Sequence, residues 1–169
     1  MNNHQEAILT TPNQVKKSQR LLIGHGALVL LFGFVMGFGF LFFLIGEISL
    51  WPIPGKIDYQ MPGTYDAWRM AHMEGITNGL MLWILAAVLP VLSEWVKRIY
   101  WVAVTMVVVA WTIVIASAID PFFPEARGLS FTPQSNFASD VAFFLFYIGI
   151  VAVCVVVVIV AFRAFRASD

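Results

Sequence analysis

Long apolar runs dominate the sequence and predict four membrane-spanning helices. A helix needs about 20 mostly apolar residues to cross the hydrocarbon core of a bilayer. Four stretches meet this requirement, at about residues 21–45, 68–92, 100–119 and 141–162. They take up most of the chain, so no separate soluble domain is expected. The predicted fold is therefore all-α, an integral membrane four-helix bundle, with the lipid bilayer as its surroundings.

The polar segments divide the chain into three parts. Residues 1–20 form a polar leader, which we expect to be a solvated tail. Residues 21–163 form the four-helix transmembrane domain, and residues 164–169 form a short tail. The first apolar run is too long for a signal peptide and has no small-residue cleavage site. We therefore expect an uncleaved helix.

The basic residues are distributed unevenly and predict the orientation in the membrane. On the side of the two termini lie Lys16, Lys17, Arg20, Lys97, Arg98, Arg163 and Arg166. The opposite loops hold only Lys56 and Arg127, with Arg69 at the membrane edge. Because cytoplasmic loops carry an excess of lysine and arginine, both termini are predicted to be cytoplasmic. The expected location is a bacterial-type inner (cytoplasmic) membrane, crossed several times.

The loops on the two sides differ in length. Residues 94–98 form a tight link, whereas residues 47–66 and 120–140 are long and rich in proline, glycine and aromatic residues. Long loops without secondary structure of their own are often functional. We expect both to fold over the outer mouth of the bundle, with loose surface loops as the alternative.

Composition and motifs exclude several classes of function. The net charge is zero, and no basic patch with interleaved aromatic residues is found, which argues against a nucleic-acid partner. The sequence also lacks a motif for covalent heme attachment, a zinc-protease motif, a nucleophile elbow and a phosphate-binding glycine loop. Hydrolases and nucleotide-dependent enzymes are therefore disfavoured.

A histidine, a glutamate and an asparagine lie close together in the second predicted span, in the stretch AHMEGITNG. Polar side chains at membrane depth are costly and by default mark a functional site. Asn78 lies about 9 Å deeper in the membrane than His72, at 1.5 Å per residue. Glu74 projects nearly opposite His72 and shares a helix face with Asn78, four residues on.

The face of His72 predicts a cofactor site. Gly75 and Gly79 share this face and are expected to clear a shallow trough for a planar macrocycle. Arg69, one turn before His72, is placed to reach an anionic group such as a propionate. His72 is the candidate metal ligand. The alternative is a histidine that is satisfied by a backbone carbonyl of a neighbouring helix.

His25 is not expected to be a second ligand. It lies near the inner end of the first span and His72 near the outer end of the second, across a core about 30 Å thick. We therefore predict a single-histidine site with an open coordination position, and a hydrogen bond from His25 to a neighbouring helix. Gly33 and Gly37 have the GxxxG spacing that allows close helix packing. A flat ligand on that face is the alternative.

Three segments carry a resemblance to a known family: LIGHGALVLLFG, PGTYDAWRMAHMEGITNG and RGLSFTPQSNFASD. They resemble motifs of the membrane-bound styrene oxide isomerases, from about residue 22 to residue 140. The resemblance implies a four-helix membrane protein that assembles as a homotrimer and holds heme b near the subunit boundaries. It also implies that His72 is the axial ligand of the iron and that Asn78 orients the substrate.

The resemblance further implies a reaction. In that family ferric iron acts as a Lewis acid on the oxygen of an aryl epoxide, the C–O bond opens toward a benzylic cation, a hydride shifts and an aldehyde leaves. An open coordination position suits this chemistry because a metal ion polarises oxygen. A dry apolar pocket keeps water from the cation. The expected substrate is an aryl epoxide or a related small hydrophobic molecule.

The third predicted span departs from the family. The family carries a tyrosine and an aspartate there, whereas residues 101–119 of this chain contain neither; the equivalent positions fall near Ser117 and Val109. Glu74 stands where the family has a small residue, and it is the candidate for the missing acid, with pairing to another helix as the alternative. The alternative function is a non-catalytic sensor or binding module for a gas or for heme. A heme-free accessory protein is a third hypothesis.

Overall fold

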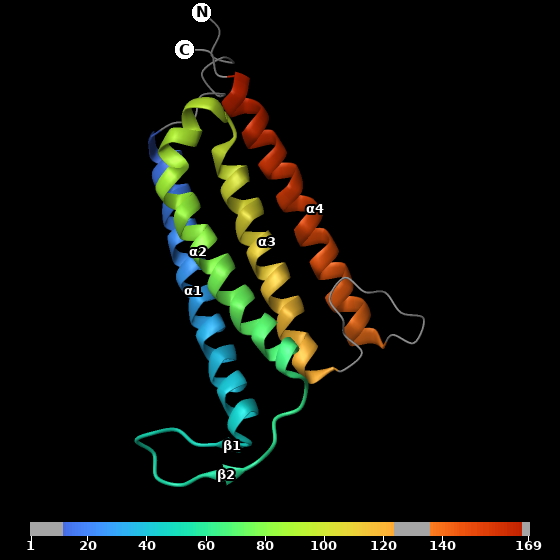
Figure 1. Cartoon of the computed structure of the whole chain (residues 1–169). Helices are drawn as coiled ribbons and strands as arrows, with labels where there is room; N and C mark the ends of the chain where they lie inside the picture. The colour runs from blue at the N-terminus through green and yellow to red at the C-terminus, as the bar shows by residue number, and fades with distance from the viewer. Residues whose placement is uncertain (1–11, 124–135, 167–169) are drawn as a thin grey trace, which may run out of the picture.

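A computed structural model describes residues 12–123 and 136–166 and confirms the predicted all-α fold. Its four helices are α1 (Pro12–Ile45), α2 (Tyr65–Trp95), α3 (Ile99–Ile119) and α4 (Phe137–Arg166). They run alternately up and down in an elongated bundle (Figure 1). The start of α1 and the end of α4 lie at one end, which we call the terminal end. We call the opposite end the hairpin end.

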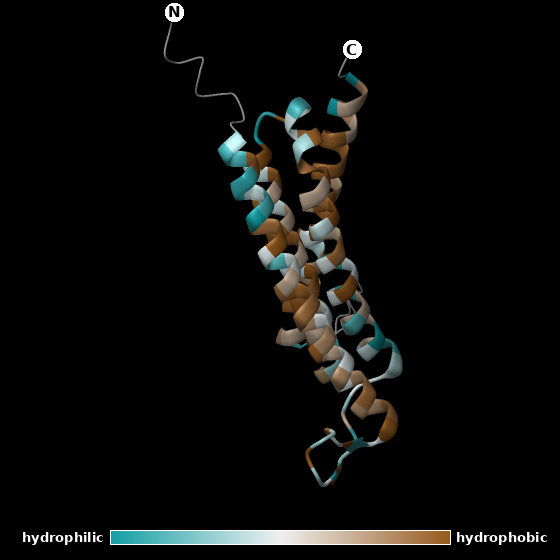
Figure 2. Ribbon diagram, turned by 90° about the vertical axis from the view of Figure 1, so that its left-hand side faces the viewer, coloured by the Kyte–Doolittle hydropathy of each residue, from teal (hydrophilic) through white to brown (hydrophobic). Residues whose placement is uncertain are grey.

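All four helices are long and apolar enough to cross a membrane. Figure 2 shows apolar residues along the helices and hydrophilic residues gathered toward their ends. Large apolar side chains such as Phe34, Ile84 and Val158 are exposed on the outside of the bundle. A lipid bilayer provides the apolar surroundings that such a surface requires. The protein is thus a multi-pass membrane protein.

Helix α1 is longer than predicted. It begins at Pro12, and proline is favoured at the first position of a helix because its missing N–H needs no partner there. Ser18 is fully buried, and the side chain of Gln19 donates a hydrogen bond of 2.9 Å to the carbonyl of Ala86 on α2. Residues 12–20 are therefore the first turns of α1 and not a separate tail: Ser18 is buried and Gln19 bonds α2, while Lys16, Lys17 and Arg20 are exposed. Residues 1–11 lie outside the described residues.

The link between α2 and α3 is as short as predicted. Helix α2 ends at Trp95, and the N–H of Val96 donates to the carbonyl of Leu92 at 2.8 Å, which closes the last turn. Helix α3 begins at Ile99. At its far end the chain continues into a single 3₁₀ turn, η2 (Asp120–Phe122).

The loop after α1 forms a small β-hairpin. Its strands β1 (Glu47–Ile48) and β2 (Ile57–Asp58) are antiparallel. The hairpin extends away from the helix ends (Figure 1), and Trp51 between the strands is 94% exposed. The prediction that this loop folds over the mouth of the bundle is wrong for residues 49–58, because these residues are exposed and the hairpin extends away from the helices. Residues 124–135 of the other long loop lie outside the described residues.

The helices do not contribute equally to the core. Helices α1, α2 and α3 contact one another, whereas α4 packs mainly against α3. The main apolar cluster accordingly joins the first three helices, through buried residues such as Val29, Leu82 and Ala110. Helix α4 therefore leaves most of its surface to lipid or to a partner.

Candidate functional site

Glycine residues bring α1 and α2 into backbone contact. A Cβ atom added to Gly33 would lie 2.9 Å from the carbonyl carbon of Gly75, and one added to Gly79 would lie 3.0 Å from the carbonyl oxygen of Gly26. Neither backbone can give way easily, so only glycine fits. We call this contact, formed by Gly26, Gly33, Gly75 and Gly79, the α1–α2 seam.

His72 lies in the seam, one turn from Gly75. Its Nδ1 is 2.9 Å from the carbonyl oxygen of Gly33. The ring lies so close to Gly37 that a Cβ atom there would be 2.8 Å from Nδ1. Both glycines of the predicted GxxxG pair thus serve close helix packing, as predicted. The hydrogen bond to a carbonyl of a neighbouring helix, which the sequence left as the alternative for His72, is also present.

This hydrogen bond fixes the tautomer of His72. A carbonyl oxygen can only accept, so Nδ1 carries the proton, and in the neutral ring Nε2 keeps its lone pair. Histidine ligands of metals generally have this arrangement, in which the nitrogen away from the metal donates to a carbonyl or carboxylate. The contact with Gly33 is therefore compatible with a ligand role at Nε2.

Several residues next to His72 at the seam are exposed, and we call this side the outer side of the seam. The imidazole is half-buried, and the described residues offer no hydrogen-bond partner to Nε2. Phe34 and Phe38, which flank Gly37 on α1, are both exposed, as is Arg69, one turn before His72 on α2. The outer side of the seam thus combines aromatic surface with one cation.

The structure corrects the role predicted for Gly75 and Gly79. They share the face of His72, as predicted, but this face points at α1. Gly75 meets the backbone of Gly33, and Gly79 meets Leu30 and the backbone of Gly26. The trough expected for a planar macrocycle is therefore filled by α1 within the chain, and these two glycines serve helix packing.

Glu74 and Asn78 form a hydrogen-bonded pair on another face of α2. Asn78 is buried, and its Nδ2 donates to Glu74 Oε2 at 2.8 Å and to the backbone carbonyl of Glu74 at 2.9 Å. The predicted shared face is thus confirmed. Met70, one turn before Glu74, packs against Ala116 of α3 and Phe146 of α4. This face of α2 therefore looks toward α3 and α4.

The predicted site residues thus fall into two groups. Successive residues of an α-helix are about 100° apart around its axis, so His72 and Asn78, six residues apart, are separated by about 120° around α2. The structure brings Glu74 and Asn78 together and keeps both away from the imidazole, which faces α1. Within one chain, His72 and Asn78 do not line a common site.

Helix α3 contains no acidic residue that could lie beside His72 or beside the Glu74–Asn78 pair. Ser117 and Val109, near the positions where the family carries tyrosine and aspartate, are almost completely buried. The hydroxyl of Ser117 donates to the carbonyl of Ile113 in its own helix at 3.0 Å. Glu74 is the only acidic residue within the four predicted spans.

His25 has the structural role that the sequence predicted. Its Nδ1 accepts a hydrogen bond of 3.1 Å from Trp111 Nε1 on α3. It precedes Gly33, the partner of His72, by about 12 Å along α1. In the described part of the chain, no three histidine, cysteine or acidic residues are grouped so that they could hold a metal ion. A metal site at His72 would accordingly draw on fewer than three such side chains of the described residues.

Comparisons with known proteins identify the family. The family model described as styrene oxide isomerase matches residues 18–165. The chain belongs to the styrene oxide isomerase family. A member, the styrene-oxide isomerase of Pseudomonas fluorescens, is 30% identical over 128 residues, which are 75% of this chain and 74% of that protein. The family match runs from the polar first turns of α1 to the end of α4 and includes both groups of site residues.

Proposed function

We propose that this protein is a heme b-dependent isomerase that converts aryl epoxides, or closely related small hydrophobic epoxides, into carbonyl compounds. Membership of the family supports the epoxide isomerase activity. The heme assignment rests on one observation, the hydrogen bond of 2.9 Å between His72 Nδ1 and Gly33 O. In the neutral ring this bond leaves Nε2 with a lone pair and, among the described residues, without a hydrogen-bond partner.

The residues around His72 fit a heme. Nε2 would be the axial ligand, and the guanidinium of Arg69 would pair with a propionate. The exposed rings of Phe34 and Phe38 would give the macrocycle an apolar surface. When bound, ferric heme supplies a Lewis acid that polarises the epoxide oxygen.

The Glu74–Asn78 pair would bind and orient the substrate. The carboxylate of Glu74 accepts from Asn78 Nδ2 at 2.8 Å and so fixes the direction of the amide. The same Nδ2 also donates to the backbone carbonyl of Glu74 at 2.9 Å, so a substrate oxygen would take the place of one of these two acceptors. As the only acidic residue in the spans, Glu74 also takes the place of the missing third-helix aspartate. The apolar helices around the pair exclude water, which would otherwise capture a cationic intermediate.

Both groups act on one substrate only if two chains meet. Because His72 and Asn78 point from different faces of α2, a site that contains both combines His72 of one subunit with Asn78 of another. The uncovered outer side of the seam provides a surface for such a contact. We therefore favour a homotrimer with its sites at the subunit boundaries.

The orientation in the membrane follows from charge. The terminal end carries Arg20, Lys97, Arg98 and Arg163, so it is assigned to the cytoplasm by the excess of positive charge. The related isomerase is bacterial, which favours the inner membrane. A reporter fused to the C-terminus that is active only in the cytoplasm checks this assignment.

The test of function uses the two histidines as a matched pair. Detergent-purified wild-type protein, His72→Ala and His25→Ala are compared by heme content, by absorption spectrum and by aldehyde formed from styrene oxide. We expect a Soret band and aldehyde in the wild type and in His25→Ala, and neither in His72→Ala. Full heme content in His72→Ala would overturn the assignment of the ligand.

A second candidate function follows from helix α3. Since neither Ser117 nor Val109 presents an acid, a heme protein that senses or binds a gas, without catalysis, is the alternative. It predicts a Soret band that shifts with carbon monoxide or nitric oxide, while styrene oxide yields no aldehyde above a control with the same heme concentration. Aldehyde above that control excludes it.

A further inference from the structure

Helices α3 and α4 leave a long groove between them. A cavity of about 600 Å³ opens at the terminal end, where Arg98 and Arg163 are part of its lining. A second cavity of about 160 Å³ follows it toward the middle of the bundle. Trp101, Thr105 and Ala152 line both cavities. The two therefore adjoin, and we call them together the α3–α4 groove.

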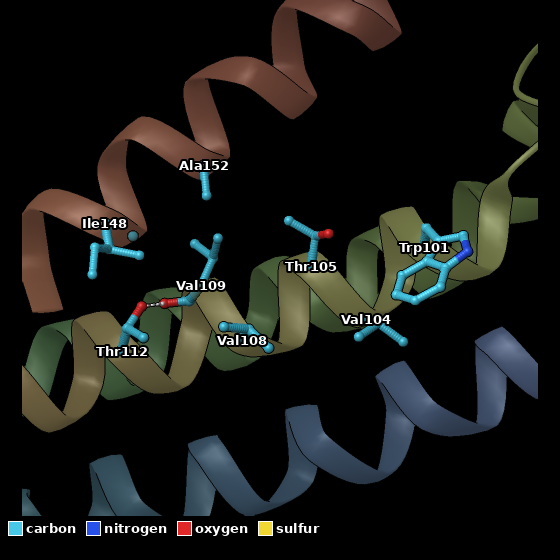
Figure 3. A pocket seen from close by; sticks show the side chains of 9 residues that line it. Trp101, Val104, Thr105, Val108, Val109, Thr112, Ile148 and Ala152 are labelled. Carbon is cyan, nitrogen blue, oxygen red and sulfur yellow. Dashed lines mark hydrogen bonds between the residues drawn. The ribbon is translucent and has the colours of Figure 1, made fainter.

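The inner part of the groove is apolar. Figure 3 shows Ile148 and Ala152 of α4 opposite Val109 and Thr105 of α3. The hydroxyl of Thr112 donates to the carbonyl of Val109 at 2.9 Å and is thus occupied within its own helix. The walls of this part offer contacts suited to a hydrocarbon chain.

The mouth of the groove is positively charged. Arg98, Arg163 and Lys97 line it, and none of the lining residues is acidic. In the described part of the chain, no carboxylate lies within ion-pair distance of Arg98 or Arg163. Basic pockets between transmembrane helices at the cytoplasmic side are typical binding sites for anionic lipid headgroups.

The length of the groove matches one leaflet of a membrane. Arg98 and Thr112 are separated by about 21 Å along α3, at 1.5 Å per residue. Half of the hydrocarbon core is about 15 Å thick. The groove thus runs from the membrane surface into the core, with Trp101 near the level where tryptophan is enriched in membrane proteins.

We propose that the α3–α4 groove binds one anionic phospholipid from the leaflet at the terminal end. Its phosphate lies between Arg98 and Arg163, and one acyl chain follows the groove past Ala152 toward Thr112. A free phosphate would leave the apolar part unused, and a zwitterionic lipid would gain less from the two arginines. The inference rests on α3 and α4 alone, and it is independent of His72 and of heme.

The charge at the mouth is tested by lipid titration. The full chain is purified in neutral detergent and titrated with phosphatidylglycerol or with phosphatidylcholine of the same acyl chains, and bound lipid is counted by native mass spectrometry. We expect phosphatidylglycerol to bind more tightly, and Arg98→Gln and Arg163→Gln each to weaken it about fivefold. The control is Arg166→Gln, because Arg166 lies at the same end but stacks on Phe162 outside the groove.

The acyl chain is tested by filling the groove. Ala152→Leu should weaken the binding of phosphatidylglycerol. Val157→Leu should leave it unchanged, because Val157 is exposed on α4 and does not line the groove. Unfolding temperatures without added lipid show whether each variant is folded. If a glutamine variant is not, Arg98→Lys and Arg163→Lys keep the charge and are expected to bind.

Several results would overturn the proposal. Equal binding of the two lipids, or unchanged binding after both arginines are replaced, would show that the mouth does not select an anionic headgroup. Displacement of the lipid by millimolar inorganic phosphate would show a simple anion site. A change of oligomeric state in the arginine variants, without any bound lipid in the wild type, would show that a second copy of the chain occupies the groove.

Discussion

The two helix pairs of this bundle meet in different ways. In the α1–α2 pair, a Cβ atom added to Gly33 would collide with the backbone of Gly75. In the α3–α4 pair, a Cβ atom added to Gly149 would lie 2.8 Å from Thr112 Oγ1 and 2.9 Å from Ile113 Cγ1, which are side-chain atoms. At these glycines, one interface is thus formed by backbone against backbone, and the other by atoms of branched side chains.

This difference explains which pair holds a fixed site. The close approach of α1 and α2 places the carbonyl of Gly33 within 2.9 Å of His72 Nδ1 and so fixes the ring. Side chains between α3 and α4 hold the helices farther apart and leave a groove. We interpret the seam as the rigid support of a cofactor ligand, and the groove as a surface that adapts to lipid.

The largest expected effect is a loss of isomerase activity in variants of helix α2. One face of α2 forms part of the α1–α2 seam, and another face is turned toward α3 and α4. His72→Ala should abolish epoxide isomerisation, and Asn78→Ala should lower its rate roughly 10²-fold, as for the loss of one orienting donor. Co-expression of the two variants should restore activity, because some subunit boundaries then combine an intact His72 with an intact Asn78. If chains mix randomly in a symmetric ring, half of the chains supply an intact His72 and half of their neighbours supply an intact Asn78. Roughly a quarter of the sites are then restored.

This experiment is measured as aldehyde formation per heme, in oligomers isolated through two different affinity tags. Oligomers of one variant carrying both tags are the control. An absence of recovered activity in verified mixed oligomers would show that each site takes both residues from the same chain.

The second prediction compares two glycines of α1. Gly33→Ala should destabilise the protein, because overpacking costs about 1–3 kcal/mol. This exceeds the roughly 0.5–1 kcal/mol that alanine gains over glycine inside a helix. Gly24→Ala should be neutral or slightly stabilising, since nothing lies within 4 Å of its added Cβ atom. Thermal unfolding in detergent, followed by tryptophan fluorescence, measures both, and an equal effect of the two substitutions would contradict the backbone contact.

The third prediction concerns a glycine-to-alanine substitution in the α3–α4 pair, at Gly149. Gly149→Ala meets two side-chain atoms and no backbone, so a rotation of Thr112 or Ile113 can make room, and its cost should be smaller than that of Gly33→Ala. The same unfolding assay is used. A loss of stability as large as that of Gly33→Ala would remove the distinction between the two interfaces.

The sequence predicted the spans well and their ends less well. Apolar runs locate the part of a helix that lies in hydrocarbon, and this signal was sufficient for all four helices. The hydropathy signal does not include Ser18 and Gln19, because both are polar. They continue α1 because they pack against α2. Hydropathy cannot show such a contact, since it depends on which helix lies alongside.

The site was predictable as far as local geometry determines it. The spacing of four residues placed Glu74 and Asn78 on one face, and their hydrogen bond confirms this. The same reasoning placed Gly75 beside His72, but it could not show that α1 fills the space next to them. The carbonyl of Gly33 was not anticipated as the partner of His72, because every residue carries a carbonyl and no pattern marks the one that is used.

The smallest expected effect on stability concerns the β-hairpin that follows α1, which belongs to neither of the two helix pairs. Lys56 Nζ lies 3.0 Å from Glu47 Oε2 and 3.2 Å from Asp58 Oδ1, and the lysine side chain is 59% exposed. The hydrogen bond to Glu47, and then the one to Asp58, raises the pKa of Lys56 above its usual 10.5. A raised lysine pKa stabilises the fold at any pH below the usual value, and this contribution is lost as the pH rises through the raised pKa.

Lys56→Met should therefore leave the dependence of the unfolding temperature on pH unchanged between pH 6 and 9, a range chosen to lie below the titration of lysine. Because exposed ion pairs contribute little and are screened by salt, the unfolding temperature itself should also be almost unchanged. A fall as large as that of Gly33→Ala would mean that the hairpin clamps the end of the seam, and that glycine packing alone does not hold α1 against α2.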